Sequence, residues 1–293
     1  MATGLHNRAM KAGSWEVEPQ AERDLVKLPE DFDYDVPLEK AFRHASNYAV
    51  ALVLDGQVFG SGTLVSAKGV HGILTAHHVM LVPERKGVEE FSLCIRNKTV
   101  HRVDVGKSQF HHVVLGDSRR QFEHSGPDLS FLMLTDENLL ATLSSVKSFY
   151  PLIEHCDVSS YPGDKMRLLP WAVSGSPAEF SEDLGLHRGE RLTKFCDFHL
   201  AAHFRSLRQK GDFDYFRFEV HSGVHGYPSK YGGVSGGGIW MPIMQEMRSR
   251  EIDFVPVLQG VVFYQSRPYC GMTRRLLVGH GPRSIYEQLI RAL

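Results

Sequence analysis

The chain has 293 residues, 42% hydrophobic and 23% charged, so it is long enough for one large or two small packed domains of a soluble globular protein. Lys and Arg number 33 against 34 Asp and Glu, and this balance argues against nucleic acid or an anionic membrane as a partner. The N-terminal residues carry no apolar run like that of a secretory signal, and no stretch approaches the roughly 18 apolar residues of a membrane span. We therefore expect a cytoplasmic protein.

Residues 1–45 are rich in charge and proline and show little periodicity, so we interpret them as an N-terminal arm or linker without regular structure. The arm contains an acidic patch, EDFDYD, at residues 30–35. We predict that this arm regulates the functional site or docks a regulatory protein partner.

From residue 46 the chain changes to short apolar runs separated by turn residues, which is typical of successive β-hairpins. One series fills residues 46–145, and a second series fills residues 165–281. Between them, residues 146–164 lack strict alternation and are interpreted as a connector. The sequence therefore predicts an all-β protein with two halves of similar length.

The last segment, residues 282–293, carries Ile285, Leu289 and Leu293 at a spacing of four, with polar residues between them. Pro282 suits the start of a helix. We expect a short C-terminal α-helix that packs one face on the body of the protein.

The cysteines are widely scattered and lack the spacing of a zinc site, a redox motif or a disulfide scaffold: Cys94, Cys156, Cys196 and Cys270. We expect free thiols in a reducing compartment. His111, His112 and His124 lie close in sequence, but no cysteine or carboxylate stands at ligand spacing beside them. Neither a metal nor another cofactor is predicted.

Residues 231–238, YGGVSGGG, place one hydroxyl, that of Ser235, among five glycines. Such a cluster most often forms a simple turn between strands. A phosphate-binding loop is disfavoured, because GIWMP continues as a strand and no Lys-Ser or Lys-Thr follows the glycines. The third interpretation is a nucleophile, which requires a histidine and a carboxylate elsewhere, because a serine hydroxyl attacks only after a base takes its proton.

Both partners occur in informative surroundings: His77 and His78 follow an apolar run in ILTAHHVM, and Asp128 directly precedes LSFLML. Asp128 lies 50 residues after His78 and 107 residues before Ser235. These motifs, in this order, resemble the trypsin-like (chymotrypsin-fold) serine proteases. The similar stretches are the opening hairpin with its Thr-Ala-x-His segment, the aspartate before an apolar strand, the Gly-x-Ser-Gly-Gly signature, and VLQGVVFYQ, which looks like the strand that lines the substrate cleft.

The resemblance covers the chain from about residue 48 to its end and implies two six-stranded antiparallel β-barrels followed by a short helix. It implies a triad in which Ser235 attacks a peptide carbonyl, His78 acts as general base, and Asp128 orients His78. The N–H groups of Gly233 and Ser235 would form the oxyanion hole.

Two adjacent histidines compete for the role of the base. One residue separates Thr75-Ala76 from His78, as in the family, so the resemblance assigns the base to His78. For His77 we expect a partly exposed turn position.

The chain also departs from the family pattern. No cysteine flanks the histidine or the serine motif, which fits an intracellular protein without the disulfides of secreted members. The opening hairpin and the His-Val pair at residues 78–79 look closer to bacterial or HtrA-type members. No segment like Ile-Val-Gly-Gly precedes Tyr48, and the residues after VVFYQ leave no room for a PDZ domain. Gly238 stands where many relatives have proline, and Phe263 where many have a serine near the triad aspartate.

Substrate specificity is less clearly encoded. Ser229 lies six residues before Ser235, where trypsin has an aspartate, and no acidic residue lies between His221 and Ser235 to attract a basic substrate side chain. Lys230, the next residue, would favour an acidic one. We expect three residues to pair with an extended substrate as an antiparallel strand: Phe263, Tyr264 and Gln265.

The sequence thus predicts a serine endopeptidase that acts on protein or peptide substrates through an acyl-enzyme intermediate. The alternative is a protease-like binding or scaffold module, in which the barrels are retained and catalysis is absent or depends on a partner.

Overall fold

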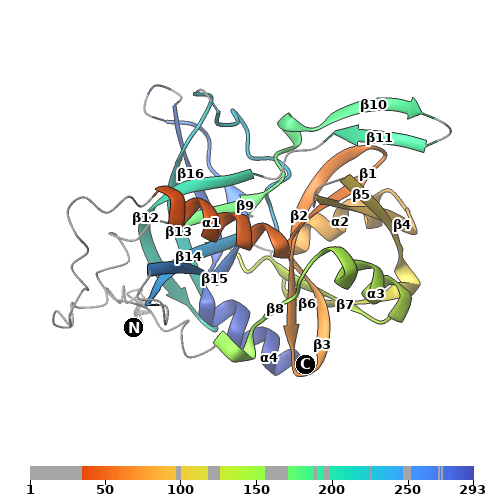
Figure 1. The fold of residues 1–293 in the computed structure, drawn as a ribbon, viewed down its shortest axis with the longest axis horizontal. Helices are drawn as coiled ribbons and strands as arrows, with labels where there is room; N and C mark the ends of the chain where they lie inside the picture. The colour runs from red at the N-terminus through yellow and green to blue at the C-terminus, as the bar shows by residue number, and fades with distance from the viewer. Residues whose placement is uncertain are drawn as a thin grey trace, which may run out of the picture.

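The computed structural model describes residues 35–96, 100–117, 126–155, 171–187, 190–194, 198–224, 226–246, 252–269, 271 and 273–293. Several predicted features lie outside these residues: most of the N-terminal arm, His124, Cys156, Cys196 and Cys270. Cys94 lies inside them, where it is buried and forms no disulfide. Figure 1 shows two β-structures side by side, with helices against them.

The first half is a curled antiparallel sheet with the strand order β5-β4-β1-β2-β3-β7-β6. Its strands are β1 (Ala49–Leu54), β2 (Gln57–Ala67), β3 (Val70–Thr75), β4 (Glu90–Arg96), β5 (Val100–Gly106), β6 (Phe110–Gly116) and β7 (Leu129–Leu134). A short strand, β8 (Tyr150–Pro151), pairs in parallel with β2. The turns after β1 and β2 are tight because Asp55-Gly56 and Lys68-Gly69 all adopt positive φ, as two-residue hairpin turns require.

The second half is a closed barrel with the strand order β12-β13-β16-β15-β14-β9. Its strands are β9 (Trp171–Gly175), β12 (Phe198–Lys210), β13 (Phe213–His221), β14 (Gly238–Glu246), β15 (Ile252–Gln265) and β16 (Arg274–His280). A separate hairpin projects away from both halves in Figure 1 and consists of β10 (Glu182–His187) and β11 (Glu190–Lys194).

The predicted all-β, double-barrel architecture with a short C-terminal helix is therefore confirmed. The first half differs in detail from the predicted six-stranded barrel. Among the described residues no pairing joins its edge strands β5 and β6, so the sheet there is a curled half-barrel.

The helices are α1 (Asp35–Ala45), α2 (His77–Arg85), α3 (Glu137–Val146) and α4 (Leu289–Ala292), with short turns at η1 (Ser46–Tyr48), η2 (Lys107–Gln109), η4 (Ile153–His155), η6 (Ala178–Phe180) and the π-helical η7 (Arg283–Gln288). The sequence analysis did not anticipate α1, α2 or α3. Helix α1 occupies the end of the predicted arm, where Ala41 and Ala45 are buried and the helix packs on β14 and β15. In the part of the chain that the structure describes, no helix is long and apolar enough to cross a membrane.

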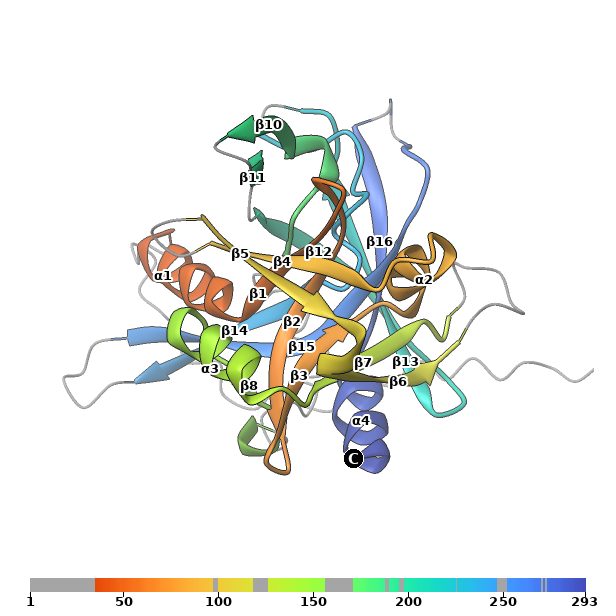
Figure 2. The same cartoon turned by 90° about the vertical axis from the view of Figure 1, so that its right-hand side faces the viewer.

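A shared apolar core joins the two halves. Trp240 of β14 is fully buried between Tyr48 and Tyr150, with ring centroids 5.6 Å from each. The C-terminal segment adds Ile285 and Leu289 to the same core, and Figure 2 shows it beneath the sheets. The terminal helix is thus part of the packing between the halves.

We predict that Ile285→Ala destabilises the fold by about 2–5 kcal/mol, because it removes a fully buried side chain and leaves a cavity. Urea denaturation monitored by circular dichroism measures this loss. Ile153→Ala is a matched control, since Ile153 is 45% exposed, and its effect should stay within about 0.5 kcal/mol. Equal effects of the two substitutions would contradict the assigned core.

Candidate active site

One carboxylate holds both the backbone and the ring of His78. His78 is the second residue of α2, and Asp128 directly precedes β7. The backbone N–H of His78 donates to Oδ1 of Asp128 at 2.8 Å, and Nδ1 lies 2.6 Å from Oδ2. The Asp128 side chain is 3% exposed and that of His78 is 43% exposed. Because a carboxylate only accepts, Nδ1 carries a proton, and Nε2 is the nitrogen that points away from Asp128.

Ser235 lies in the glycine turn before β14, and this turn connects the two halves. The N–H of Ser61, in β2, donates to the carbonyl of Ser235 at 2.8 Å. The hydroxyl of Thr75, at the end of β3, donates to the carbonyl of Ser61 at 2.8 Å. A Cβ on Gly236 would lie 1.9 Å from the oxygen of Ser61 and 2.3 Å from the hydroxyl of Thr75. The serine turn therefore packs against the strand end that leads into His78.

The backbone of the turn leaves alternate N–H groups open. Val234, Gly236 and Gly237 donate to carbonyls of Tyr231, Val262 and Val234. Among the described residues, the N–H groups of Gly233 and Ser235 have no protein acceptor. Gly233 has a φ of +89°, and a Cβ there would lie 2.6 Å from the carbonyl oxygen of Ser176. The two N–H groups that the resemblance assigns to an oxyanion hole are thus available to a ligand.

The Ser235 hydroxyl itself points elsewhere. Its Oγ donates to the carbonyl of Phe263 at 3.5 Å, which is a long hydrogen bond. Within the described residues, no hydrogen bond joins Ser235 to His78. Ser235 is thus linked through Ser61 and Thr75 to the strand end that leads into His78, while no hydrogen bond of the described residues connects serine to histidine.

The expectation for His77 is wrong. Its side chain is 3% exposed, and Nδ1 lies 2.9 Å from the hydroxyl of Ser130 in β7. His112 lies 2.9 Å from the same hydroxyl, and the two imidazole rings are 5.5 Å apart. His77 is buried because α2 turns its first residue against β7. No three His, Cys, Asp or Glu side chains of the described segments are grouped as a metal site.

The predicted specificity residues Ser229 and Lys230 are tied to an acidic side chain that the sequence analysis missed. Glu179 of η6 accepts from the hydroxyl of Ser229 at 2.7 Å, from its N–H at 3.1 Å and from the N–H of Lys230 at 2.8 Å. Burial alone raises the pKa of Glu179, but these hydrogen bonds outweigh it and hold the pKa below its ordinary value. The negative charge of Glu179 thus lies beside Ser229, although the two residues are 50 positions apart in the sequence.

The predicted substrate-pairing residues differ in placement. The Phe263 side chain is 2% exposed and packs in the core, so only its main chain can reach a ligand. Tyr264 and Gln265 are half-buried, and Oε1 of Gln265 accepts the N–H of Tyr231 at 2.8 Å. Gln265 therefore also supports the residue that starts the glycine turn.

A buried histidine, His280, contacts the main chain of Asp128 and was not singled out in the sequence. The N–H of Asp128 donates to Nε2 of His280 at 3.0 Å. Burial lowers the pKa of His280 to about 4, although the nearby carboxylates of Asp128 and Asp214 act in the opposite direction. His280 is thus a neutral imidazole near pH 7.

Comparisons with known proteins give a likeness of structure only. No family model matches the chain, and no curated protein matches it. An inactive serine-to-alanine mutant of Rv3671c from M. tuberculosis H37Rv is 13% identical, with a TM-score of 0.45 over 89% of this chain and 93% of that chain. A serine endoprotease from Yersinia pestis is 16% identical, with a TM-score of 0.43 over 86% and 66%.

The serine protease domain of the Sesbania mosaic virus polyprotein is 13% identical, with a TM-score of 0.40 over 82% of this chain and 91% of that chain. All three TM-scores lie below 0.5. The double-barrel arrangement rests on the strand pairing within this chain.

We predict that the free energy of unfolding falls as the pH drops from 6.5 towards 4. Burial also lowers the pKa of His199 to about 4, so in this window the unfolded chain binds more protons than the folded chain. Each of the two histidines contributes up to about 1.4 kcal/mol per pH unit. Urea denaturation at several pH values measures the slope, which should be shallower in His280→Gln. An identical slope in that variant would contradict the assignment for His280.

We predict that Glu179→Gln increases hydrogen exchange at the amides of Ser229 and Lys230 by about three- to ten-fold, since a charged acceptor with three hydrogen bonds is lost at an exposed position. Hydrogen exchange followed by NMR measures it. Glu154→Gln, on the exposed turn η4, is the matched control and should leave both amides unchanged. If hydrogen exchange at these two amides is unchanged in Glu179→Gln, the carboxylate does not hold the Ser229–Lys230 segment.

Proposed function

We propose that the chain is a serine endopeptidase that hydrolyses peptide bonds through Ser235, His78 and Asp128. The observation that carries the proposal is the double hydrogen bond from His78 to Asp128. A buried carboxylate that fixes both the main chain and the Nδ1 of a half-exposed histidine leaves Nε2 oriented as a general base.

The chemistry follows from these groups. Oγ of Ser235 attacks the substrate carbonyl carbon, and its proton passes to Nε2 of His78. The negative oxygen of the tetrahedral intermediate accepts from the N–H groups of Gly233 and Ser235. Collapse expels the amine, which takes the proton from His78, and leaves an ester on Ser235. Water then attacks the ester with His78 again as base, which releases the acid and restores the serine.

This sequence requires the Ser235 hydroxyl to leave the carbonyl of Phe263 and turn towards His78. Catalytic hydrogen bonds are often long or misaligned before substrate binds, so the observed position is compatible with the proposal. In the family, a carbonyl at the position of Phe263 would accept a substrate N–H, and a bound peptide would then compete with the serine for it.

The second candidate is a binding or scaffold module in which catalysis is silent or depends on a partner. One observation favours it, namely the hydrogen bond of Ser235 to Phe263 in place of a bond to His78. This alternative would be supported if the protein cleaved no member of a diverse peptide library while circular dichroism showed that it was folded.

We predict that a fluorophosphonate probe labels the wild-type chain and does not label Ser235→Ala, because the probe reacts with an activated serine hydroxyl. His78→Ala should slow labelling by about 10³-fold or more, since the base is removed. Labelling rates are measured by gel fluorescence or intact mass.

Ser145→Ala is the matched control, because Ser145 is an exposed serine on α3, and it should be labelled at the wild-type rate. Unchanged labelling of Ser235→Ala would rule out Ser235 as the nucleophile. No labelling of the wild-type chain would count against the endopeptidase and favour the binding module.

A further inference from the structure

We propose that His280, Ser284 and Asp214 form a buried positioning chain that holds Asp128 in place and makes the C-terminal helix part of the active site. The proposal rests on the proposed function, because it assigns these three residues to the orientation of the catalytic base. None of them would touch the substrate, and each would act through Asp128.

The first link is the main chain of Asp128. Both carboxylate oxygens of Asp128 accept from His78, so its position must be fixed by other atoms. Its N–H donates to Nε2 of His280 at 3.0 Å, across 152 residues of sequence. Because Nε2 accepts, the proton of the neutral imidazole lies on Nδ1.

The second link connects the His280 ring to Ser284 in the C-terminal helical segment. Nδ1 of His280 lies 3.4 Å from the hydroxyl of Ser284, which also accepts the N–H of Asp214 at 3.0 Å. The hydroxyl proton of Ser284 has two acceptors, both on Asp214: Oδ1 at 2.7 Å and the main-chain carbonyl at 3.0 Å. With either acceptor the serine donates to Asp214, so its oxygen is left to accept from His280.

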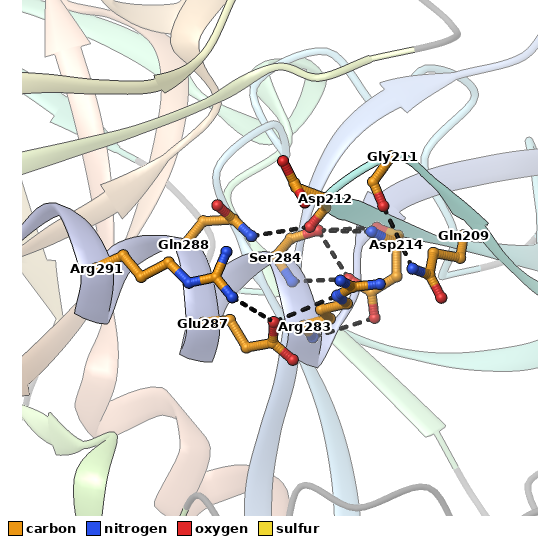
Figure 3. Close-up of polar contacts among 9 residues, drawn as sticks. All are labelled: Gln209, Gly211, Asp212, Asp214, Arg283, Ser284, Glu287, Gln288 and Arg291. Carbon is orange, nitrogen blue, oxygen red and sulfur yellow. Dashed lines mark hydrogen bonds and ion pairs between the residues drawn. The ribbon is translucent and has the colours of Figure 1, made fainter.

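Asp214 anchors the far end (Figure 3). Its Oδ1 accepts the N–H of Ser284 at 2.8 Å, and its Oδ2 accepts the N–H of Arg283 at 3.1 Å. Its carbonyl accepts the N–H of Gly281 at 3.0 Å, and a Cβ on Gly281 would lie 2.4 Å from Oδ2. The Asp214 carboxylate, from β13, thus fixes the first turn after β16, which contains Ser284.

The residues of this positioning chain are buried, so breaking one of its hydrogen bonds is costly. His280 and Ser284 are fully buried, and Asp214 and Asp128 are each 2% exposed. The ring of Phe263 lies 4.7 Å from that of His280, and the ring of Tyr215 lies 5.3 Å from it. With water excluded by these rings, a lost acceptor would leave a buried N–H without a partner.

Phe263 also explains why the contact comes from His280. The family resemblance gives this position a serine near the aspartate, and a phenyl ring offers no hydrogen bond there. Its ring instead packs on His280, which supplies an acceptor to the main chain of Asp128. Where the family pattern has a serine, this protein thus has Phe263, and the hydrogen bond to Asp128 comes from His280.

Two substitutions at one position test the chain. His280→Gln keeps an acceptor, because its Oε1 can reach the place of Nε2, whereas His280→Met is of similar size and offers only a weakly accepting thioether. We expect His280→Met to slow fluorophosphonate labelling about ten-fold and to lose exchange protection at the amide of Asp128. His280→Gln should stay within about three-fold of wild type and retain that protection.

Ser284→Ala should slow labelling less than His280→Met and add little in the double variant, because both substitutions interrupt one chain. Glu287→Gln is the control on the same helix, since the ion pairs of Glu287 with described residues are those with two partly or largely exposed arginines, Arg283 and Arg291. It should change neither labelling nor the Asp128 amide.

The proposal is overturned if a folded His280→Met labels at the wild-type rate, or if both His280 variants slow labelling equally and only in proportion to their loss of stability. If His280→Met does not fold, Ser284→Ala decides: exchange at the Asp128 amide no faster than in Glu287→Gln overturns the chain. If the wild-type chain is not labelled at all, the proposed function fails separately. Loss of Asp128 amide protection in His280→Met, with retention in His280→Gln, would still support the positioning chain.

Discussion

The pair of hydrogen bonds between His78 and Asp128 is the constraint on which the rest of the site depends. A buried carboxylate is costly unless its oxygens are satisfied, and here both are satisfied by one residue. The main-chain bond fixes where α2 begins, and the ring bond fixes which nitrogen faces outward. The buried aspartate therefore determines the position of the His78 ring and which of its nitrogens faces the carboxylate, and anything that holds Asp128 also holds His78.

The glycine turn packs closely against both halves of the molecule. A Cβ on Gly236 would lie 1.9 Å from the oxygen of Ser61 in the first sheet, and one on Gly237 would lie 1.9 Å from the oxygen of Ser174 in the barrel. Close approach of backbone to backbone on both sides is possible only without side chains. The glycines thus set the position of Ser235 relative to two independently formed sheets.

What the sequence could predict was the chemistry contained in short stretches. The histidine, aspartate and serine motifs are each contiguous, so their types and order were readable. Helix α3 was also readable in principle, since Asp136 caps it and Leu139 and Leu143 lie on one buried face, but the sequence analysis placed this stretch at the end of the first β series. The contact of His280 with Asp128 spans 152 residues and has no local pattern, and burial of His77 depends on β7 packing against it. Such tertiary contacts leave no periodic signal.

The position of the Ser235 hydroxyl carries less weight than the surrounding framework. A hydrogen bond of 3.5 Å to the carbonyl of Phe263 is weak, and even a good one contributes a net stabilisation of only about 1 kcal/mol. Rotation about one side-chain bond exchanges this partner for another. Asp128 and the glycine turn, in contrast, are held by buried contacts: the N–H of Asp128 donates to His280, and the glycines pack against Ser61 and Ser174. Under the proposed function, a bound peptide that donates to the carbonyl of Phe263 would release the Ser235 hydroxyl, so the buried framework constrains the site more than the rotamer of the serine does.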